Sequence, residues 1–430
     1  MRVIVVGAGA GGSTAARELA RGGAQVLVLE AGGRRRPFTR RAPWASPLRH
    51  TGLLRPATLS RVVPGMEVKQ ADGGLLVIRG IGEGGCTVLS CGNWVRGERG
   101  FAEIGLDLRP EFEELEAILR PAPFPRDRWR PVTERLFLAA AAIGLDPLPA
   151  PKVIDARRCQ ACGLCELGCG SGARWDARRF LADARQAGAT IRLDAAVDRV
   201  IIDGNRARGV TLSRSRGASL DADAVVLAAG GIGTARILRA SGLVPADRLW
   251  VDIVLTVGGR LEGARQLDEP PMVWFARQEG FILAPYPDLL SHFLHRPWRG
   301  VPLGDRVGLM VKLADESNGR IGVDGRVTKE LAASDRARLD EASALAREVM
   351  ARAGISGPYV DGILNGGHLG GTAPLRREDV PSMRPAGLPD GLWIADLSLV
   401  PRAQGLPTMA TSAAVALRVA RRVLAAPGDA

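Results

Sequence analysis

The chain has 430 residues, enough for two or three domains or for one large domain with insertions. Its 46% hydrophobic and 24% charged residues are ordinary for a globular protein. The net charge of +12 comes mainly from scattered arginines without interleaved aromatic residues, so we expect no nucleic-acid partner. No apolar stretch reaches the about 20 residues that span a bilayer. Because the first residues already resemble a strand, we expect a cytoplasmic protein.

The first thirty residues predict a strand, a helix and a second strand. Arg2–Val6 is a continuous apolar run, as expected for a strand buried on both faces. Residues 13–22 have the composition of a helix, and "AQVLVLE" follows as the second strand. A short glycine-rich connection, "GAGAGG", joins the first strand to the helix. This order is typical of a nucleotide-binding β-α-β unit.

Three glycines of the connection, Gly7, Gly9 and Gly12, stand at the spacing G-x-G-x-x-G. In such a unit the first permits the tight turn, the second lets the backbone approach a pyrophosphate, and the third lets helix and strand pack closely. The helix N-terminus offers unpaired N–H groups and a positive dipole end to phosphates. Glu30, at the end of the second strand, can accept hydrogen bonds from the ribose hydroxyls. The pattern therefore predicts a bound dinucleotide.

Further elements follow in chain order. Residues 190–214 contain alternating, β-branched segments around an Asp-Gly turn and predict antiparallel strands. An apolar strand, "AVVLAA", then leads into Gly230 and a helix. Residues 246–325 are mixed, whereas 335–353 predict a helix with Ser334 as its N-cap. The chain closes with the strand "LWIAD", a turn and a long amphipathic helix.

Four of the six cysteines are concentrated in the stretch "CQACGLCELGC". They are Cys159, Cys162, Cys165 and Cys169. The spacing C-x₂-C-x₂-C-x₃-C is the one that holds a 4Fe–4S cluster in bacterial ferredoxins, although here the run occurs once and glycine, not proline, follows it. A tetrahedral zinc site and cysteines without metal are the alternatives. If a remote thiol replaces Cys169 as the fourth ligand, Cys86 and Cys91 are the candidates.

Four segments, in the same order, resemble the glucose-methanol-choline (GMC) family of flavin oxidoreductases. They are "GAGAGGSTAARELARGGAQVLVLEAG", "GGCTVLSCGNWVRG", "AGGIGTARILRASG", and "HLGGT" followed by "WIADLSLVPRAQGLPTMATSAAVAL". Together they span nearly the whole chain. The resemblance implies an α/β fold: a Rossmann-type, glutathione-reductase-like FAD-binding domain with an inserted α+β substrate domain. It also implies FAD rather than NAD, bound in an extended groove.

The resemblance and the element order divide the chain into three parts. We expect a discontinuous FAD-binding domain that comprises residues 1–150, 186–245 and 365–430. Residues 151–185 would form a cysteine-rich, iron–sulfur insertion. Residues 246–364 would form the substrate domain, which is shorter than is usual in the family.

The family positions also imply contacts to FAD. Asp396 would bind the ribityl or pyrophosphate region, the alternative being an ordinary cap or turn acid, and Val197 would lie near the adenine. The flavin-side segment would contribute Gly85, Ser90, Cys91 and Gly92, the last three approaching the isoalloxazine. A helix that starts near Pro407 and Thr408 would direct its positive end at the flavin oxygens.

His368 is the catalytic candidate among the four histidines, because it stands in the glycine-rich loop "NGGHLGGT". The family places its active-site histidine here, where a neutral imidazole can take a hydroxyl proton while hydride moves to the flavin. The alternative is a histidine that only hydrogen-bonds flavin or backbone. The family's second histidine or asparagine is replaced by Leu406, which neither accepts a proton nor orients a hydroxyl. Gln404 and Asn365 are the possible substitutes.

These features predict a FAD-dependent dehydrogenase that acts on the CH–OH group of a small alcohol or lipid-like substrate. Electrons would leave through the 4Fe–4S cluster to a one-electron carrier such as a ferredoxin or a quinone-linked protein. Two alternatives stay open. One is an iron–sulfur flavoprotein reductase of an alkene or prenyl chain, which Leu406 also suits. The other is an electron-transfer flavoprotein without substrate chemistry.

Overall fold

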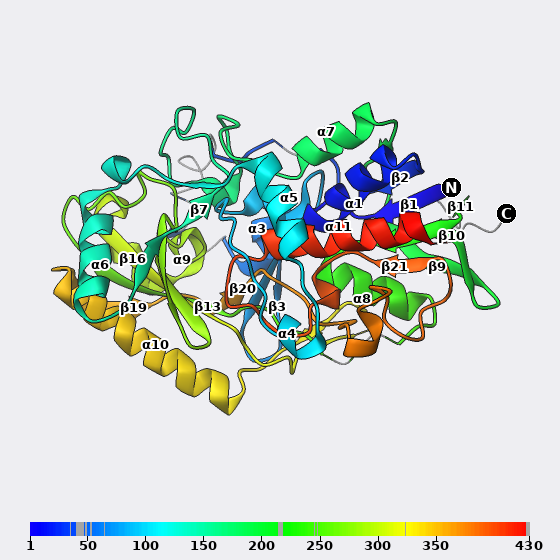
Figure 1. The fold of residues 1–430 in the computed structure, drawn as a ribbon. Helices are drawn as coiled ribbons and strands as arrows, with labels where there is room; N and C mark the ends of the chain where they lie inside the picture. Colours follow the sequence, from blue (N-terminus) through cyan, green and yellow to red (C-terminus); the bar gives the residue numbers. More distant parts are fainter. Residues whose placement is uncertain are drawn as a thin grey trace.

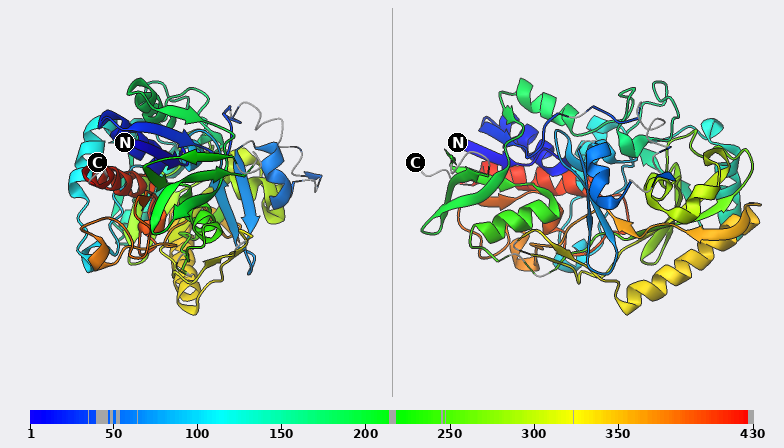
Figure 2. Two further views of the ribbon diagram at one scale, coloured as in Figure 1. Left: turned by 90° about the vertical axis from the view of Figure 1, so that its right-hand side faces the viewer. Right: turned by 180° about the vertical axis from the view of Figure 1, so that it is seen from behind.

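Two large sheets, joined by several crossings of the chain, organise the computed structural model of the protein (Figure 1). One sheet lies toward the two chain ends and the other at the opposite end of the molecule, in both orientations that show the long axis (Figures 1 and 2). The described residues are 1–34, 36–39, 47, 50–51, 54–63, 65–213, 218–244, 246, 248–322 and 324–426.

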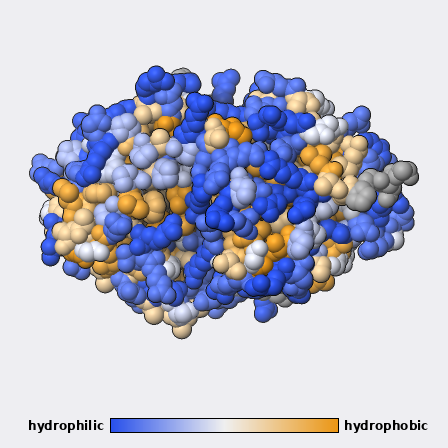
Figure 3. Space-filling view, in the orientation of Figure 1, coloured by the Kyte–Doolittle hydropathy of each residue, from blue (hydrophilic) through white to orange (hydrophobic). Residues whose placement is uncertain are grey.

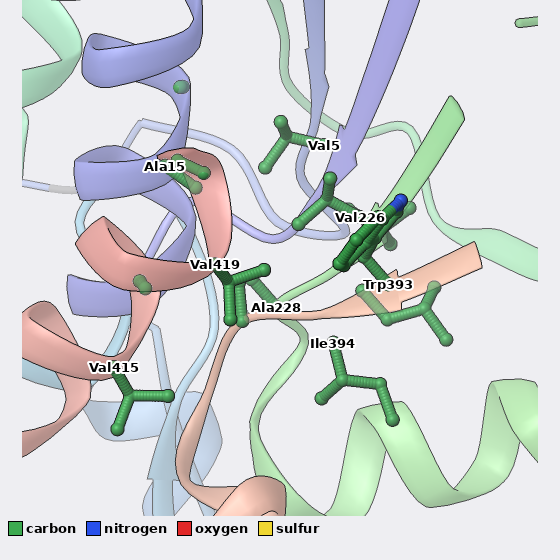
Figure 4. Packing of buried hydrophobic residues seen from close by; sticks show 14 of the residues in the cluster. Val5, Ala15, Val226, Ala228, Trp393, Ile394, Val415 and Val419 are labelled. Atoms are coloured by element: carbon green, nitrogen blue, oxygen red, sulfur yellow. The ribbon is translucent and has the colours of Figure 1, made fainter. Parts of the chain in front are cut away.

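The first sheet is parallel and has the strand order β21-β12-β1-β2-β8. Its strands are β1 (Arg2–Val6), β2 (Gln25–Leu29), β8 (Thr190–Arg192), β12 (Ala224–Leu227) and β21 (Leu392–Ile394). Beside it, α1 (Ala10–Arg21) packs against α11 (Met409–Ala425), and Ala15 and Val419 from these helices face the sheet (Figure 4). The order is that of a Rossmann-type domain, so the predicted fold class is confirmed.

A second, nine-stranded sheet has the order β3-β4-β20-β13-β16-β15-β14-β6, with β19 also paired to β13. Its strands are β3 (Met66–Gln70), β4 (Leu76–Gly80), β6 (Pro147–Pro149), β13 (Val254–Arg260), β14 (Trp274–Gln278), β15 (Phe281–Pro285), β16 (Arg306–Leu313), β19 (Ser356–Asp361) and β20 (Asn365–Gly366). Side chains of β16 alternate between its two faces, as strand geometry requires. Val311 joins the apolar core toward α10, whereas Met310 joins a separate apolar group on the other face.

Smaller elements complete the fold. The other strands are β9 (Val197–Asp203), β10 (Arg206–Leu212) and β11 (Ser219–Asp221), which form a three-stranded sheet, and the pairs β5 (Ala122–Pro123) with β7 (Pro151–Lys152) and β17 (Arg320–Ile321) with β18 (Val327–Thr328). The remaining α-helices are α3 (Pro56–Val62), α4 (Phe101–Ile104), α5 (Arg109–Leu119), α6 (Pro131–Ala142), α7 (Arg178–Gln186), α8 (Gly230–Ala240), α9 (Leu289–Leu294) and α10 (Ala333–Arg352).

The sheets divide the chain differently from the expected domain boundaries. Residues 66–80 and 147–149, expected in the FAD-binding part, contribute strands to the nine-stranded sheet. The sequence gives no signal for this exchange, because strand partners are set by contacts far apart in the chain. The predicted helix at 335–353 is present as α10, but its N-cap is Ala332, whose backbone is extended, and Ser334 lies inside the first turn.

The surface is predominantly hydrophilic on the face shown in Figure 3, where apolar residues form small, separate groups. Scattered apolar residues of this kind are usual on globular proteins. Among the helices in the described part of the chain, none combines the length and the apolar character that a bilayer span requires.

Candidate active site at the junction of two cavities

The glycine-rich turn after β1 is shaped by close packing at two of its three predicted glycines. Gly7 has φ +108°, which favours glycine, and a Cβ at Gly12 would lie 2.0 Å from the carbonyl oxygen of Gly7. Gly9 differs, because a Cβ there would meet only the Cα of Gly85, at 4.0 Å. Nothing in the protein therefore requires glycine at position 9. The open space lies in a groove, which is what close approach of a ligand to the backbone needs.

This groove, of about 260 Å³, runs from the carboxyl ends of β1 and β2 to the start of α11. The N-terminal residues of three helices line it: Ala10 of α1, Gly230 of α8 and Met409 of α11. Each helix N-terminus carries unpaired N–H groups and a partial positive charge. Three of them around one groove suit a ligand with several anionic oxygens, such as the pyrophosphate of a dinucleotide.

Glu30 lies in the wall of the groove at the end of β2. Its carboxylate accepts hydrogen bonds from the backbone N–H groups of Ala8, Gly32 and Gly82, each at 2.9 Å. Burial raises the pKa of Glu30, and these three N–H groups oppose the rise. The carboxylate is therefore held at the position from which a ribose could be bound.

Asp396 follows β21 and also lines the groove. Its two carboxylate oxygens accept hydrogen bonds from the N–H of Gly230 at 2.8 Å, the hydroxyl of Thr234 at 2.6 Å and the N–H of Ser398 at 2.8 Å. Burial raises its pKa despite these donors. Asp396 thus ties the start of α8 to the end of β21, the capping role that was its alternative, and the residue also lines the groove.

A second cavity, of about 190 Å³, adjoins the groove on the side of the nine-stranded sheet. Both cavities are lined by Cys86, Ser90, His368 and Thr408. The groove would hold the length of a dinucleotide, and the shared residues mark where its redox ring would meet a substrate. The residues present therefore fit FAD, bound along the groove with the flavin at this junction.

Most of the predicted cofactor residues come together here. The groove is lined by Gly7, Gly9, Glu30, Gly85, Ser90, Val197, Asp396 and Thr408, and the second cavity by Ser90, Cys91, Pro407 and Thr408. Gly12 and Gly92 line neither cavity. Gly12 serves the packing of α1 on β1, and the carbonyl of Gly92 accepts a hydrogen bond from Val153 N. Thr408 is the N-cap of α11, one residue after Pro407.

His368 lies at the junction and is held by a carboxylate that the sequence did not indicate. Its Nδ1 is 3.1 Å from Oδ2 of Asp252, which is fully buried and accepts a hydrogen bond from Gly405 N at 2.8 Å through its other oxygen. Lys312 Nζ lies 3.7 Å from the same Oδ2. Burial and the charge of Lys312 lower the pKa of His368, while Asp252 and the Leu406 carbonyl oppose this. The balance favours a neutral imidazole.

Leu406, which replaces the family's second polar residue, lies in an apolar environment. Leu406 belongs to a buried apolar group with Val254, Met272 and Met310. Gln404 does not substitute for it, because its side chain is bonded to the backbone of Arg99 and Arg402, away from the second cavity.

Asn365, the other possible substitute, does line the second cavity, and its side-chain amide donates to Ile363 O at 2.9 Å. Two further polar residues of this cavity, Tyr286 and Glu166, were not anticipated, and the hydroxyl of Tyr286 donates a hydrogen bond to Glu166. Burial raises the pKa of Glu166 to about 7.

The sequence does contain a signal for two of the unanticipated residues, Asp252 and Lys312. Asp252 interrupts the apolar run "LWVDIVLTV", and Lys312 interrupts "VGLMVKL". A lone charge within a buried strand is rare unless it is paired or functional. The pattern alone does not say which partner each charge meets.

The four clustered cysteines are not arranged as metal ligands. In the part of the chain that the structure covers, no three His, Cys, Asp or Glu side chains form a group that could hold a metal ion. Cys159 packs against the apolar core, while Cys169 lies 3.5 Å from both Ser171 Oγ and Arg174 N. Cys165 is close enough to Cys159 and Cys162 for their charges to raise its pKa, though burial is the larger cause. As arranged, these residues do not fit a 4Fe–4S cluster.

The fold and the groove are those of a dinucleotide-binding protein. Residues 107–263 match the family model described as GMC oxidoreductase, and residues 5–39 match that of an NAD(P)-binding Rossmann-like domain. Over these residues the chain is similar to the GMC oxidoreductases, as its sequence segments indicated, and FAD is the cofactor that this similarity and the groove support.

Relatives in sequence and in fold are similar to this chain to different extents. An uncharacterized GMC-type oxidoreductase of Mycobacterium tuberculosis is 34% identical over 286 residues, which cover 63% of this chain but only 43% of that protein. An uncharacterized protein of Methanocaldococcus jannaschii is 26% identical over 349 residues, 80% of this chain and 86% of that one. Pyridoxine 4-oxidase from Mesorbium loti shares the fold with a TM-score of 0.76 at 18% identity, and a formate oxidase of Aspergillus oryzae with 0.69 at 17%, each over 98% of both chains.

Proposed function

We propose that the protein is a FAD-dependent dehydrogenase that oxidises the CH–OH group of a small or lipid-like alcohol, with His368 as general base. The observation that carries this proposal is the position of His368, which lines both the groove and the second cavity. An imidazole at that junction can reach a substrate hydroxyl on one side while it adjoins the cofactor on the other. FAD, when bound, accepts the hydride that leaves the carbon atom.

Asp252 prepares His368 for this role. It accepts the Nδ1 proton, which leaves Nε2 with the free lone pair that takes the hydroxyl proton. As Nε2 becomes protonated, the buried carboxylate stabilises the imidazolium, the same division of labour as in a Ser-His-Asp triad. Because the pKa of His368 is lowered, the base is in its active form at neutral pH.

The second cavity supports an apolar substrate body. Aliphatic and aromatic side chains form most of its wall, among them Leu59, Leu289, Phe293, Val254 and Met310. Such a wall gives affinity to hydrocarbon and little to a sugar. A cavity beside the flavin position also favours substrate chemistry over a purely electron-transferring flavoprotein.

The test is anaerobic bleaching of the bound flavin by a panel of primary and secondary aliphatic alcohols. Wild-type protein is expected to be reduced by at least one of them, and His368→Ala to react about 10²- to 10⁴-fold more slowly with its FAD content unchanged. The opposite result, no reduction by alcohols but reoxidation of chemically reduced flavin by isoprenoid alkenes, would replace this proposal with the alkene reductase. Failure of both reactions would leave the electron-transfer role.

The 4Fe–4S cluster stays a prediction from spacing, and no step of the proposal passes through it. Iron and acid-labile sulfide should be counted in anaerobically purified protein, with a Cys162→Ser variant as the control. About four irons per chain that the variant loses would establish the cluster, together with the need for a one-electron carrier such as a ferredoxin or a quinone-linked protein. Absence of iron and sulfide would assign the four thiols no metal.

A further inference from the structure

Three lysines of the described chain are buried, and one of them differs from the others in its hydrogen bonds. Lys152 donates to Cys91 O, Asn93 Oδ1 and Pro271 O, all within 3.0 Å. Lys329 likewise has three close acceptors, on Glu316, Asn318 and Asp315.

An ammonium has three N–H donors, so both of these lysines are fully bonded. Lys312 is only 4% exposed, yet its one hydrogen bond within the described residues is a long one, 3.5 Å to the carbonyl of Asp252.

A ligand in the second cavity can supply the acceptors that Lys312 lacks. Lys312 lines that cavity but not the nucleotide groove. Strand alternation places it on the same face of β16 as Met310, toward the cavity, while Val311 points into the core on the other face. A buried ammonium without acceptors is costly, and the Asp252 carboxylate, 3.7 Å away, compensates its charge without saturating its donors.

We propose that Lys312 binds the oxygen atom of the substrate's reacting C–O group and so supplies the polar contact that Leu406 cannot make. This inference rests on the proposed alcohol chemistry, since it names the group that holds the alcohol beside His368. Both Lys312 and His368 contact the same oxygen of Asp252, so their free polar atoms converge on one region of the cavity. As the hydroxyl proton passes to His368, the ammonium stabilises the negative charge that grows on the oxygen.

The inference narrows the substrate class. A cation aimed at the reacting oxygen, within a wall that is mostly apolar, suits an alcohol that carries its hydroxyl at the end of a hydrocarbon body. It also suits ligands that already bear an oxyanion, because these make a charge-assisted hydrogen bond to the ammonium. A planar phenolate is the simplest such ligand for a cavity of about 190 Å³.

The experiment uses 4-nitrophenolate, above the pH at which it ionises, and the uncharged 4-nitroanisole as two probes. Their binding to the FAD-loaded protein is measured by equilibrium dialysis, which needs no turnover. Lys312→Met should weaken phenolate binding about 10- to 100-fold and leave the anisole unchanged, and Lys312→Arg should restore most of the phenolate affinity. Lys69→Met is the matched control, because Lys69 donates to Gly325 O outside the cavity.

A second variant guards against misfolding. Lys312→Met leaves the buried carboxylate of Asp252 without its cation, which could destabilise the fold. The double variant Asp252→Asn/Lys312→Met removes both charges, and its binding of the two probes is measured in the same way. Equal phenolate affinity in wild type and either folded variant would overturn the inference. An equal loss for both probes would do the same, because it indicates a structural role.

The same measurements distinguish failure of the proposed function from failure of this inference. Lys312-dependent phenolate binding without oxidation of any alcohol would keep the oxyanion site and reject the dehydrogenase.

Discussion

The two cavities that meet at His368 are built from different parts of the chain. The nucleotide groove is made mainly of backbone: the glycine-rich turn after β1 and the N-termini of α1, α8 and α11. The second cavity is lined by side chains from distant segments, among them Lys312 and His368, which both contact the buried carboxylate of Asp252. Substitutions in the groove should therefore change stability and FAD binding through steric fit. Substitutions around the cavity should change reaction rate and ligand binding through charge and the position of protons. Each of the following measurements tests that difference.

The largest effect is expected where the groove is packed most tightly. In Gly12→Ala the new Cβ would lie 2.0 Å from Gly7 O, so β1 and α1 must separate. We expect a loss of about 3 kcal/mol in the free energy of unfolding, together with loss of bound FAD. Denaturant titration and the flavin content of purified protein measure the two. A stable variant that retains FAD would contradict the close packing described here.

A buried carboxyl group outside both cavities, that of Glu269, should show itself in the pH dependence of stability. Glu269 accepts hydrogen bonds from Arg130 N and the Thr133 hydroxyl, and burial raises its pKa from 4.5 to about 7. A carboxyl whose pKa is higher in the folded state contributes stability below pH 4.5, and this contribution is lost as the pH rises through 7. The loss is about 3 kcal/mol.

Glu269→Gln should remove this pH dependence, because the amide stays neutral and can bond both partners. Thermal melting of wild type and variant between pH 5 and pH 8 checks the expectation. The melting temperature of the variant, relative to that of wild type, should increase as the pH rises. A variant that follows the wild-type pH profile would show that Glu269 does not ionise in this range.

Asp252→Asn sharpens the contrast at the cavity, because it changes proton position with almost no change in shape. The amide can donate to Nδ1 of His368 and force the ring proton onto Nε2, the atom that should accept the substrate proton. We expect an about 100-fold slower flavin reduction by the best alcohol, with FAD content unchanged. A fall in the apparent affinity for the alcohol, without a fall in the rate, would instead assign Asp252 to substrate binding.

The smallest effect is expected at Gly9, where the protein leaves room. In Gly9→Ala the new methyl group meets only Gly85 Cα at 4.0 Å, so the free energy of unfolding of the apoprotein should stay unchanged. FAD should bind about tenfold more weakly, since the methyl group occupies ligand space. Fluorescence titration of apoprotein with FAD measures this. If Gly9→Ala destabilises the apoprotein as much as Gly12→Ala, the groove is not shaped for a ligand at that point.

Local order along the chain was enough to predict the groove. Gly7, Gly9 and Glu30 act through backbone conformation and position at a strand end, and both follow from local order in the chain. The strand-turn-helix pattern that predicts the first β-α-β unit also places a ligand at its turn. For the same reason, Thr408 was found at the start of α11.

Only the tertiary structure decided the chemistry of the second cavity. The positions of Asp252, Lys312 and His368 are up to 116 residues apart, and their meeting depends on the pairing of β13 with β16 and on the return of the last loops to the sheet. Local pattern marks each charge as unusual within an apolar strand but cannot name its partner. The cysteines show the opposite case, because their spacing predicts a cluster, yet no three potential metal ligands are grouped in the described residues and the cluster stays a prediction. Spacing along the chain sets which thiols are neighbours, whereas burial and packing set where each sulfur points.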